Sequence, residues 1–216
     1  MAIAYDATSQ NSSASASNIT FNHTTSGTNR YLYVTVFAGS GTPTVTYNGV
    51  SMTQLLGPTG GSVFAFGLAN PALGTNTVSV SAGASILTGC AVSYTGVDSA
   101  SPINTSNSAS QNTTAANIAL TSTVDNCWMV VGGTTPSTSA TAGANTTLRT
   151  NPGIAGGLPV AQYMMDSGSP KTPAGALTLN LNTSSSSNTT LMAVMLTPNT
   201  TAPVSARIGL LGVGQA

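Results

Sequence analysis

Apolar and polar side chains alternate along most of this chain, and that period of two constrains the fold more than any other feature. In the run 30–37, for example, Leu32, Val34 and Val36 fall on one face of an extended segment. No segment of the sequence shows the 3.6-residue period of an amphipathic helix. We therefore predict an all-β protein with antiparallel strands.

Turn-forming residues separate the alternating runs. Asn48-Gly49 stands between the runs 44–47 and 50–53, and Asn-Gly is the strongest short hairpin signal because a type I′ turn needs positive φ at both central residues. Further strands are predicted at 3–5, 18–22, 62–68, 76–82, 87–94, 117–123, 127–131, 160–165, 176–181 and 190–196. Loops are predicted at 134–145 and 183–188.

Many short strands with regular turns are typical of a sandwich or barrel. We expect a single antiparallel β-sandwich domain, jelly-roll or Ig-like, over residues 1–199, followed by an extended C-terminal tail over 200–216. We find no clear tandem repeat in the sequence. The tail ends in an apolar run punctuated by glycine, and we predict that it docks on a neighbouring subunit through Ile208, Leu210, Leu211 and Val213. Disorder is the alternative for such a terminus.

Charged side chains are scarce: four are basic and four acidic, and there is one histidine, His23. Acid–base catalysis, metal ligation and phosphate binding need clustered ionisable groups. We therefore predict no enzymatic activity, no cofactor and no metal. Four dispersed cations cannot form the basic patch that nucleic acid requires, and no run approaches the roughly 18 apolar residues of a membrane helix. Neither nucleic acid nor a membrane is expected as a partner.

Individual residues have simple structural interpretations. His23 has no carboxylate near it in the sequence and is expected at the surface at a strand end. Cys90 and Cys127 lie in apolar runs and are expected to be small buried side chains, with a disulfide between neighbouring strands as the alternative. Asp98 is expected to cap a turn by bonding a backbone amide two residues on.

Several strand and turn segments follow one another in a recognisable order: Asn29–Val34, Pro43–Thr53, Asn70–Gly74, Val78–Val80 and Ala91–Asp98 with Pro102. In this order they resemble a known group of modules, the jelly-roll-like β-sandwiches of tailed-phage virion accessory proteins and secreted bacterial surface proteins. The resemblance covers roughly residues 18–198 and specifies fold rather than function. The family carries no catalytic motif to transfer.

The resemblance implies a non-enzymatic virion structural protein, a capsid decoration or head-appendage subunit made in the host cytoplasm. Its partners would be further copies of itself, as a homo-oligomer, and other virion proteins such as the major capsid protein. The alternative is a carbohydrate-binding or adhesive module of a bacterial surface protein, located outside the cell, with Trp128 and Tyr163 stacking on glycans. Core packing is the other use of these two aromatic side chains.

Overall fold

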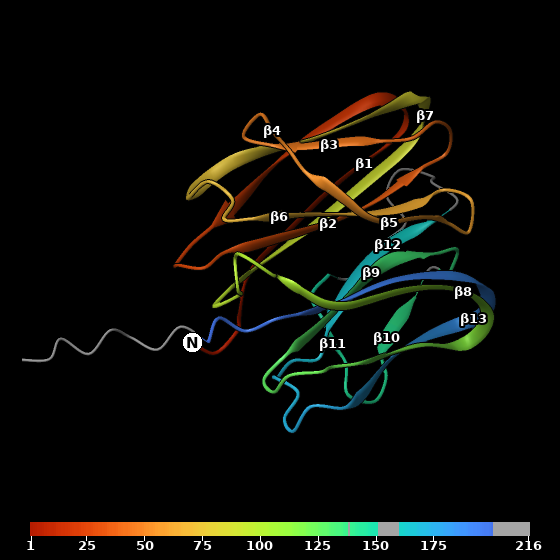
Figure 1. The fold of residues 1–216 in the computed structure, drawn as a ribbon. Coiled ribbons are helices and arrows are strands. Elements are labelled where there is room, and N and C mark those ends of the chain that lie inside the picture. The colour runs from red at the N-terminus through yellow and green to blue at the C-terminus, as the bar shows by residue number, and fades with distance from the viewer. Residues whose placement is uncertain (138, 151–159, 201–216) are drawn as a thin grey trace, which may run out of the picture.

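Every regular element of the described chain is a β-strand (Figure 1). The computed structural model describes residues 1–137, 139–150 and 160–200. The first half contains β1 (Ala4–Thr25), β2 (Tyr31–Ala38), β3 (Thr44–Tyr47), β4 (Val50–Ser51), β5 (Thr53–Thr59), β6 (Val63–Ala69) and β7 (Gly74–Thr95). The second half contains β8 (Ile103–Thr121), β9 (Trp128–Thr135), β10 (Ala140–Ala142), β11 (Thr147–Leu148), β12 (Ala161–Asp166) and β13 (Ala176–Leu196). The all-β prediction is confirmed.

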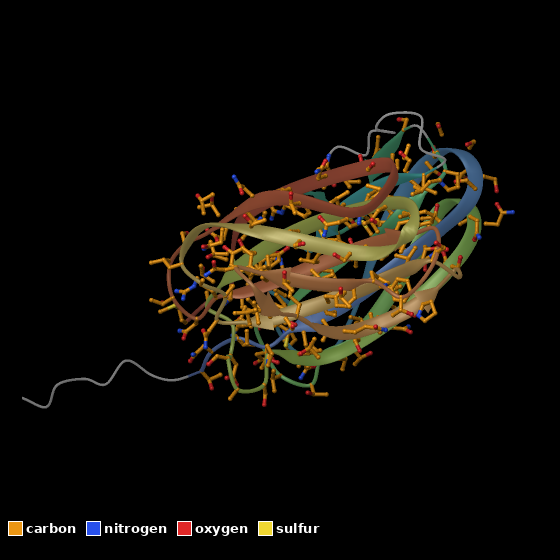
Figure 2. The ribbon with its side chains drawn as sticks, turned by 90° about the horizontal axis from the view of Figure 1, so that it is seen from above. Atoms are coloured by element: carbon orange, nitrogen blue, oxygen red, sulfur yellow. The ribbon has the colours of Figure 1, made fainter. Side chains whose placement is uncertain are left out.

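Each half of the chain forms its own sheet. The first has the order β4-β3-β7-β2-β6-β5, with β1 beside β7, and the second has the order β10-β13-β9-β12-β11, with β8 beside β13. The neighbours are antiparallel, and β1 and β7 run side by side over their length (Figure 2). Since β7 pairs first with β3 and then with β2, the sheet curls towards a barrel. No helix of the described residues could span a membrane.

The two sheets are two copies of one arrangement. Replacing β1, β2, β3, β5, β6 and β7 by β8, β9, β10, β11, β12 and β13 converts the first strand order into the second, and β4 has no counterpart. The duplication is a feature of the strand order, and no clear tandem repeat in the sequence announces it. Once the strands are matched, weak sequence identities appear. They are Ser9-Gln10-Asn11 with Ser110-Gln111-Asn112, Asn18-Ile19 with Asn117-Ile118, and Asn29 with Asn126. Both Asn29 and Asn126 have positive φ, at 54° and 61°.

Three apolar clusters form the core of the part of the chain that the structure describes. One lies between the halves and joins Tyr33 and Tyr94 to Trp128. The second lies within the curl of the first sheet and includes Tyr47, and the third lies within the curl of the second sheet and includes Leu179. Every residue of β9 is consequently buried, on both faces of the strand. The two halves therefore share one core layer and each enclose another.

Polar strands account for the main errors in the predicted elements. The loop expected at 183–188 is wrong, because β13 is continuous from Ala176 to Leu196. Residues 76–82 and 87–94 are likewise parts of one strand, β7, and the loop expected at 134–145 contains β10. Runs of Ser, Thr and Asn carry no apolar period to reveal them, and their extended form depends on pairing with a neighbouring strand.

Two predictions about organisation stay open. The core layer shared by the halves is compatible with a single domain over residues 1–199, and that assignment remains a prediction. The residues predicted to dock on a neighbour, Ile208, Leu210, Leu211 and Val213, lie outside the described residues.

Candidate functional site

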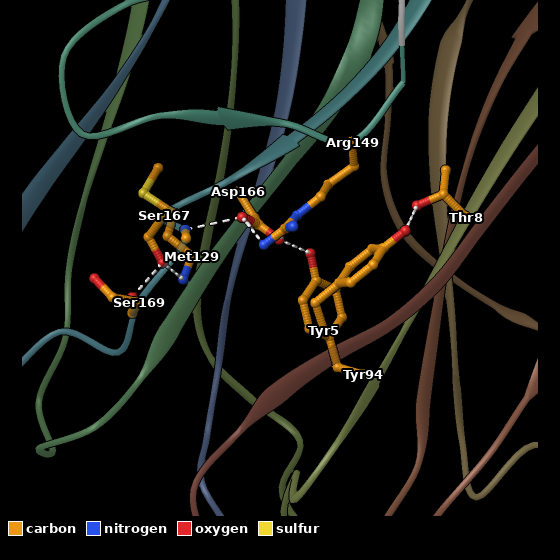
Figure 3. Close-up of polar contacts among 9 residues, drawn as sticks. Tyr5, Thr8, Tyr94, Met129, Arg149, Asp166, Ser167 and Ser169 are labelled. Atoms are coloured by element: carbon orange, nitrogen blue, oxygen red, sulfur yellow. Dashed lines mark hydrogen bonds and ion pairs between the residues drawn. The ribbon is translucent and has the colours of Figure 1, made fainter.

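One ion pair joins described residues, and it lies at the junction of the two halves (Figure 3). Asp166, at the end of β12, is fully buried, and its carboxylate accepts hydrogen bonds from Nε and Nη2 of Arg149 at 2.7 and 3.0 Å. Tyr94, from the first half, donates its hydroxyl to the same carboxylate at 2.6 Å. The backbone N–H of Gly168 donates at 2.8 Å. The carboxylate is therefore held by both halves.

Aromatic rings surround this ion pair. The guanidinium carbon of Arg149 lies 4.1 Å from the centre of the Tyr5 ring, a cation–π contact. Tyr5 meets Tyr94 edge-on at 6.2 Å between ring centres, and Tyr94 lies 6.0 Å from Trp128. The hydroxyl groups of Tyr5 and Thr8 share a hydrogen bond of 2.9 Å. We call Asp166, Arg149, Tyr94 and Tyr5 the inter-half cluster.

Two members of the inter-half cluster, Arg149 and Tyr94, have pKa values raised by their surroundings. Burial disfavours the charged form of Arg149, but the hydrogen bonds and charge of Asp166 outweigh this and raise the pKa of Arg149. Burial, together with the adjacent Asp166 carboxylate, raises the pKa of Tyr94 well above its usual value. At neutral pH Tyr94 is therefore a donor and Arg149 a cation. The acid–base groups of the cluster are already paired, so it fits a structural link between the halves better than a reaction centre.

A second polar cluster lies between the two ends of β1. The Asp6 carboxylate accepts hydrogen bonds from the backbone N–H of Ser26 at 2.9 Å, from the Ser26 hydroxyl, and from the Ser93 hydroxyl at 2.7 Å. His23 is only 1% exposed, so its predicted surface position is wrong. Its Nδ1 shares a 2.8 Å hydrogen bond with the Ser9 hydroxyl, and its Nε2 has no partner among the described residues.

This second cluster contains the residue types of a Ser–His–Asp triad in a different arrangement. Burial lowers the pKa of His23 to about 4, although the nearby Asp6 charge opposes the shift. Burial opposes ionisation of Asp6, but the bonds from Ser26 and Ser93 outweigh it and lower the Asp6 pKa. In a triad the carboxylate bonds one imidazole nitrogen while the other faces the serine. Here the Asp6 carboxylate instead accepts its hydrogen bonds from the Ser26 and Ser93 hydroxyls and from the backbone N–H of Ser26.

The second half of the chain has hydrogen bonds similar to those of Asp6, made by amide side chains in place of a carboxylate. Asn104, like Asp6, bonds both the backbone and the hydroxyl of one residue: its Oδ1 accepts from the N–H of Thr123 at 2.9 Å, and its Nδ2 donates to Thr123 Oγ1 at 2.7 Å. Further along β8, Gln111 accepts from the N–H of Asn117 at 2.9 Å and donates to its carbonyl at 2.7 Å. The Gln111 amide therefore occupies backbone groups of the outer strand β8 that would otherwise be open to pairing.

Both residues predicted to stack on glycans are buried. Trp128 is 5% exposed and Tyr163 is 0% exposed, and the Tyr163 hydroxyl donates to the carbonyl of Thr190 at 2.7 Å. Neither side chain presents a ring face to a sugar, which argues against the glycan platform. The core-packing interpretation of these aromatic residues is confirmed.

The remaining single-residue predictions concern the cysteines and Asp98. Cys90 and Cys127 are buried and free, and they belong to different apolar clusters. This confirms their interpretation as small core residues. Asp98 Oδ1 accepts from the N–H of Ala100 at 3.0 Å, which confirms the predicted turn.

Sequence reasoning did not identify the inter-half cluster. The available signal was Asp166 itself, because a carboxylate directly after an apolar strand needs a partner if it is buried. The partners could not be found in the same way. Arg149 comes from a separate segment and Tyr94 from the other half, and neither stands in a recognisable motif with Asp166.

Comparisons were made with protein-family models, with curated proteins and with solved structures, and no match was found. Among the described residues, no group of three or more His, Cys, Asp or Glu side chains could hold a metal ion.

Proposed function

We propose that this protein is a non-enzymatic structural subunit of a virion, a capsid decoration or head-appendage protein of a tailed phage. The observation that carries this proposal is an outer surface formed by β1, β7 and β3, where short uncharged side chains stand in register. We call this surface the neutral face. Its rows are Asn18–Ser81–Thr44, Thr20–Ser79–Thr46, Asn22–Thr77 and Thr24–Thr75.

The neutral face suits burial against another subunit. Removing an ion from water costs several kcal/mol, whereas a hydroxyl or amide that regains a hydrogen bond costs little. The side chains are also partly ordered in advance. Asn18 Nδ2 donates to Ser79 at 3.1 Å and to Ser81 at 2.6 Å, and Thr24 shares a 2.8 Å bond with Thr75. Pre-ordered side chains lose less entropy when they are covered.

The proposal includes the finer description of the fold, a jelly-roll-like or Ig-like sandwich of the kind found in virion and surface modules. The long strands support it, because β7 pairs with β3 over its first part and with β2 over its second, as expected of a strand shared by two layers. It also includes a homo-oligomer that contacts the major capsid protein, and a location on the virion.

Within this proposal the C-terminal tail docks on a neighbouring subunit. Burial of Ile208, Leu210, Leu211 and Val213 would contribute about 1.5–3 kcal/mol for each large side chain, before the cost of ordering the tail. Deleting residues 200–216 should leave a folded protein that no longer assembles, and sedimentation velocity of the full and shortened chains measures this. Replacing Thr200 and Thr201 with serine in the full chain is the matched control and should leave assembly unchanged. Normal assembly of the shortened chain would contradict a docking tail.

Sedimentation of lysate from the native source tests the virion role. The protein is followed across the gradient by mass spectrometry. Migration with a large particle at constant stoichiometry is the expected result. Recovery only as a small soluble species would refute the proposal and favour the surface-module alternative.

A further inference from the structure

The two copies of the fold differ in the connection that leads into the last long strand of each half. In the first half, β6 joins β7 through residues 70–73, whereas in the second half β12 joins β13 through residues 167–175. A pocket of about 210 Å³ lies beside the longer connection. It is lined by Asn145, Ser167, Ser169, Pro170, Lys171, Thr172 and Leu177. The repeat allows this pocket to be compared with the same place in the other copy.

Leu177 marks the matching position in the first half. Leu177 pairs with Leu120, and Val78 pairs with Phe21. Leu120 and Phe21 each stand two residues after the isoleucine of the shared Asn-Ile sequence, so Leu177 corresponds to Val78. The neighbour of Val78 on the other side is Tyr47, whose side chain is fully buried. A large ring therefore fills the first-half position that corresponds to the pocket.

The short first-half connection is closed by hydrogen bonds. Tyr47 donates its hydroxyl to the carbonyl of Ala72 at 3.3 Å, and Asn76 Nδ2 donates to the same carbonyl at 3.3 Å. In the second half Asn145 stands beside β13 at this level, with its Nδ2 3.5 Å from the carbonyl oxygen of Thr178. None of the described residues that line the pocket is aromatic. The longer connection, with no ring in the position that Tyr47 fills in the first half, leaves the space open.

The lining combines one cation with neutral polar groups and a small apolar part. Lys171 is the only lysine of the chain and makes no ion pair with the part of the chain that the structure describes. Its backbone is held in place, since its N–H donates to the carbonyl of Cys127 at 2.7 Å and its carbonyl accepts from Asn126 at 2.8 Å. The nearby Asp125 does not line the pocket and accepts from the N–H of Ala174 at 2.6 Å.

These groups match the parts of an acidic sugar. A carboxylate suits the ammonium group of Lys171, because hydrogen bonds between charged groups are the stronger ones. The hydroxyl groups of Ser169 and Thr172 suit the sugar hydroxyls, and the small apolar part at Pro170 and Leu177 suits a C–H edge of the ring. A volume of about 210 Å³ equals that of about seven waters at about 30 Å³ each, which admits one sugar ring and not a drug-sized ligand.

We propose that this pocket binds a single sugar that carries a carboxylate, a hexuronic acid either free or at the end of a polysaccharide. Lys171 holds the carboxylate. The site is separate from the buried aromatic residues Trp128 and Tyr163, and it does not depend on the assembly role proposed above.

Titration of the isotope-labelled full chain, followed by amide NMR shifts, tests the site. The probes are glucuronic acid, glucose and acetate. Glucuronic acid should shift the signals of residues 145 and 167–177 and should bind about tenfold more tightly than either glucose or acetate. A glucuronate-ended oligosaccharide tells the two sources apart, because tighter binding than the free sugar identifies a chain end as the natural ligand. Equal binding of glucuronic acid and acetate, shifts confined to other residues, or no shifts would overturn the proposal.

Variants test the role of each part of the pocket. Lys171→Gln should weaken glucuronic acid binding about tenfold and leave glucose unchanged, whereas Lys171→Arg should retain most of the binding. Asn145→Tyr adds a ring to a residue that lines the pocket and should abolish binding of every probe; because Asn145 has a φ of 59°, its thermal unfolding is compared with that of the unaltered chain. Leu73→Ala, at the exposed first-half connection, is the matched control and should bind normally. Unchanged binding by Lys171→Gln, in a chain whose thermal unfolding is unaltered, would refute the role of Lys171.

Discussion

Acidification should destabilise this protein through its single histidine. Burial lowers the pKa of His23 to about 4 in the folded chain, while in the unfolded chain it is near 6.5. Above about pH 6.5 both states hold a neutral imidazole. As the pH falls, the unfolded state takes up the proton first, so stability is lost from about pH 6.5 down to the folded pKa. The gap corresponds to about 3 kcal/mol, of which about 2 kcal/mol is lost between about pH 7 and pH 4.5.

The surroundings of His23 explain the direction of this change. The ring is 1% exposed, lies 6.4 Å from the Tyr47 ring centre and bonds Ser9 through Nδ1. Protonation would add a charge beside Nε2, which has no acceptor among the described residues. Asp6 is the nearby compensating charge, and its oxygens are already bonded to Ser26 and other donors. The depressed pKa of Asp6 adds a further loss at still lower pH, since its carboxylate is also stabilised in the folded state.

Denaturant unfolding at stepped pH measures the effect, with the fluorescence of buried Trp128, the single tryptophan, as the signal. His23→Gln is the matched variant, because it keeps a polar side chain that does not titrate, and its stability should stay nearly constant between about pH 7 and pH 5. The His23 ring protons, followed by NMR, should titrate near pH 4. A midpoint near pH 6.5, or the same pH slope in both proteins, would refute the reasoning.

Two further predictions concern the polar bonds of the fold. Asp166→Asn leaves the partly buried arginine of the inter-half cluster without its counter-charge and should lower the free energy of unfolding in urea by about 3 kcal/mol. The control Asp98→Asn, in a turn, should change this free energy by less than about 0.5 kcal/mol. Equal effects of the two substitutions would contradict a link between the halves. Gln111→Ala frees the N–H and carbonyl of Asn117 on outer strand β8 and should cost about 1–2 kcal/mol and increase self-association in light scattering. Gln54→Ala removes a single exposed bond and should do neither.

Local geometry could be predicted from the sequence alone. The Asn48-Gly49 hairpin is present, with φ of 50° and 77° at the two residues, because few residue types tolerate that conformation. The run beginning at Tyr31 became β2, as its alternation indicated. Asp98 bonds an amide two residues on, which is a purely local interaction. Signals of this kind depend on neighbours in sequence and therefore survive without knowledge of the fold.

The candidate sites could not be predicted from the sequence in this way. The scarcity of charge predicted that ionisable groups would not gather, yet Asp166 meets Arg149 and Tyr94 in the core. His23 is near Asp6 because the two ends of β1 approach one another when the sheet curls. The pocket at Lys171 forms because the connection 167–175 lies beside Asn145 and β13. Each of these depends on contacts between residues far apart in the chain.

What the sequence determined by itself was the class of the fold, an all-β protein with its turns, because alternation and turn chemistry act over a few residues. The tertiary structure alone decided the internal duplication, the pairing of the polar strands and the burial of His23 and Asp166. The physical reason is that runs of Ser, Thr and Asn have no preferred face of their own. The neighbouring strand, by its backbone bonds, decides whether such a run becomes a strand and which side chains it buries.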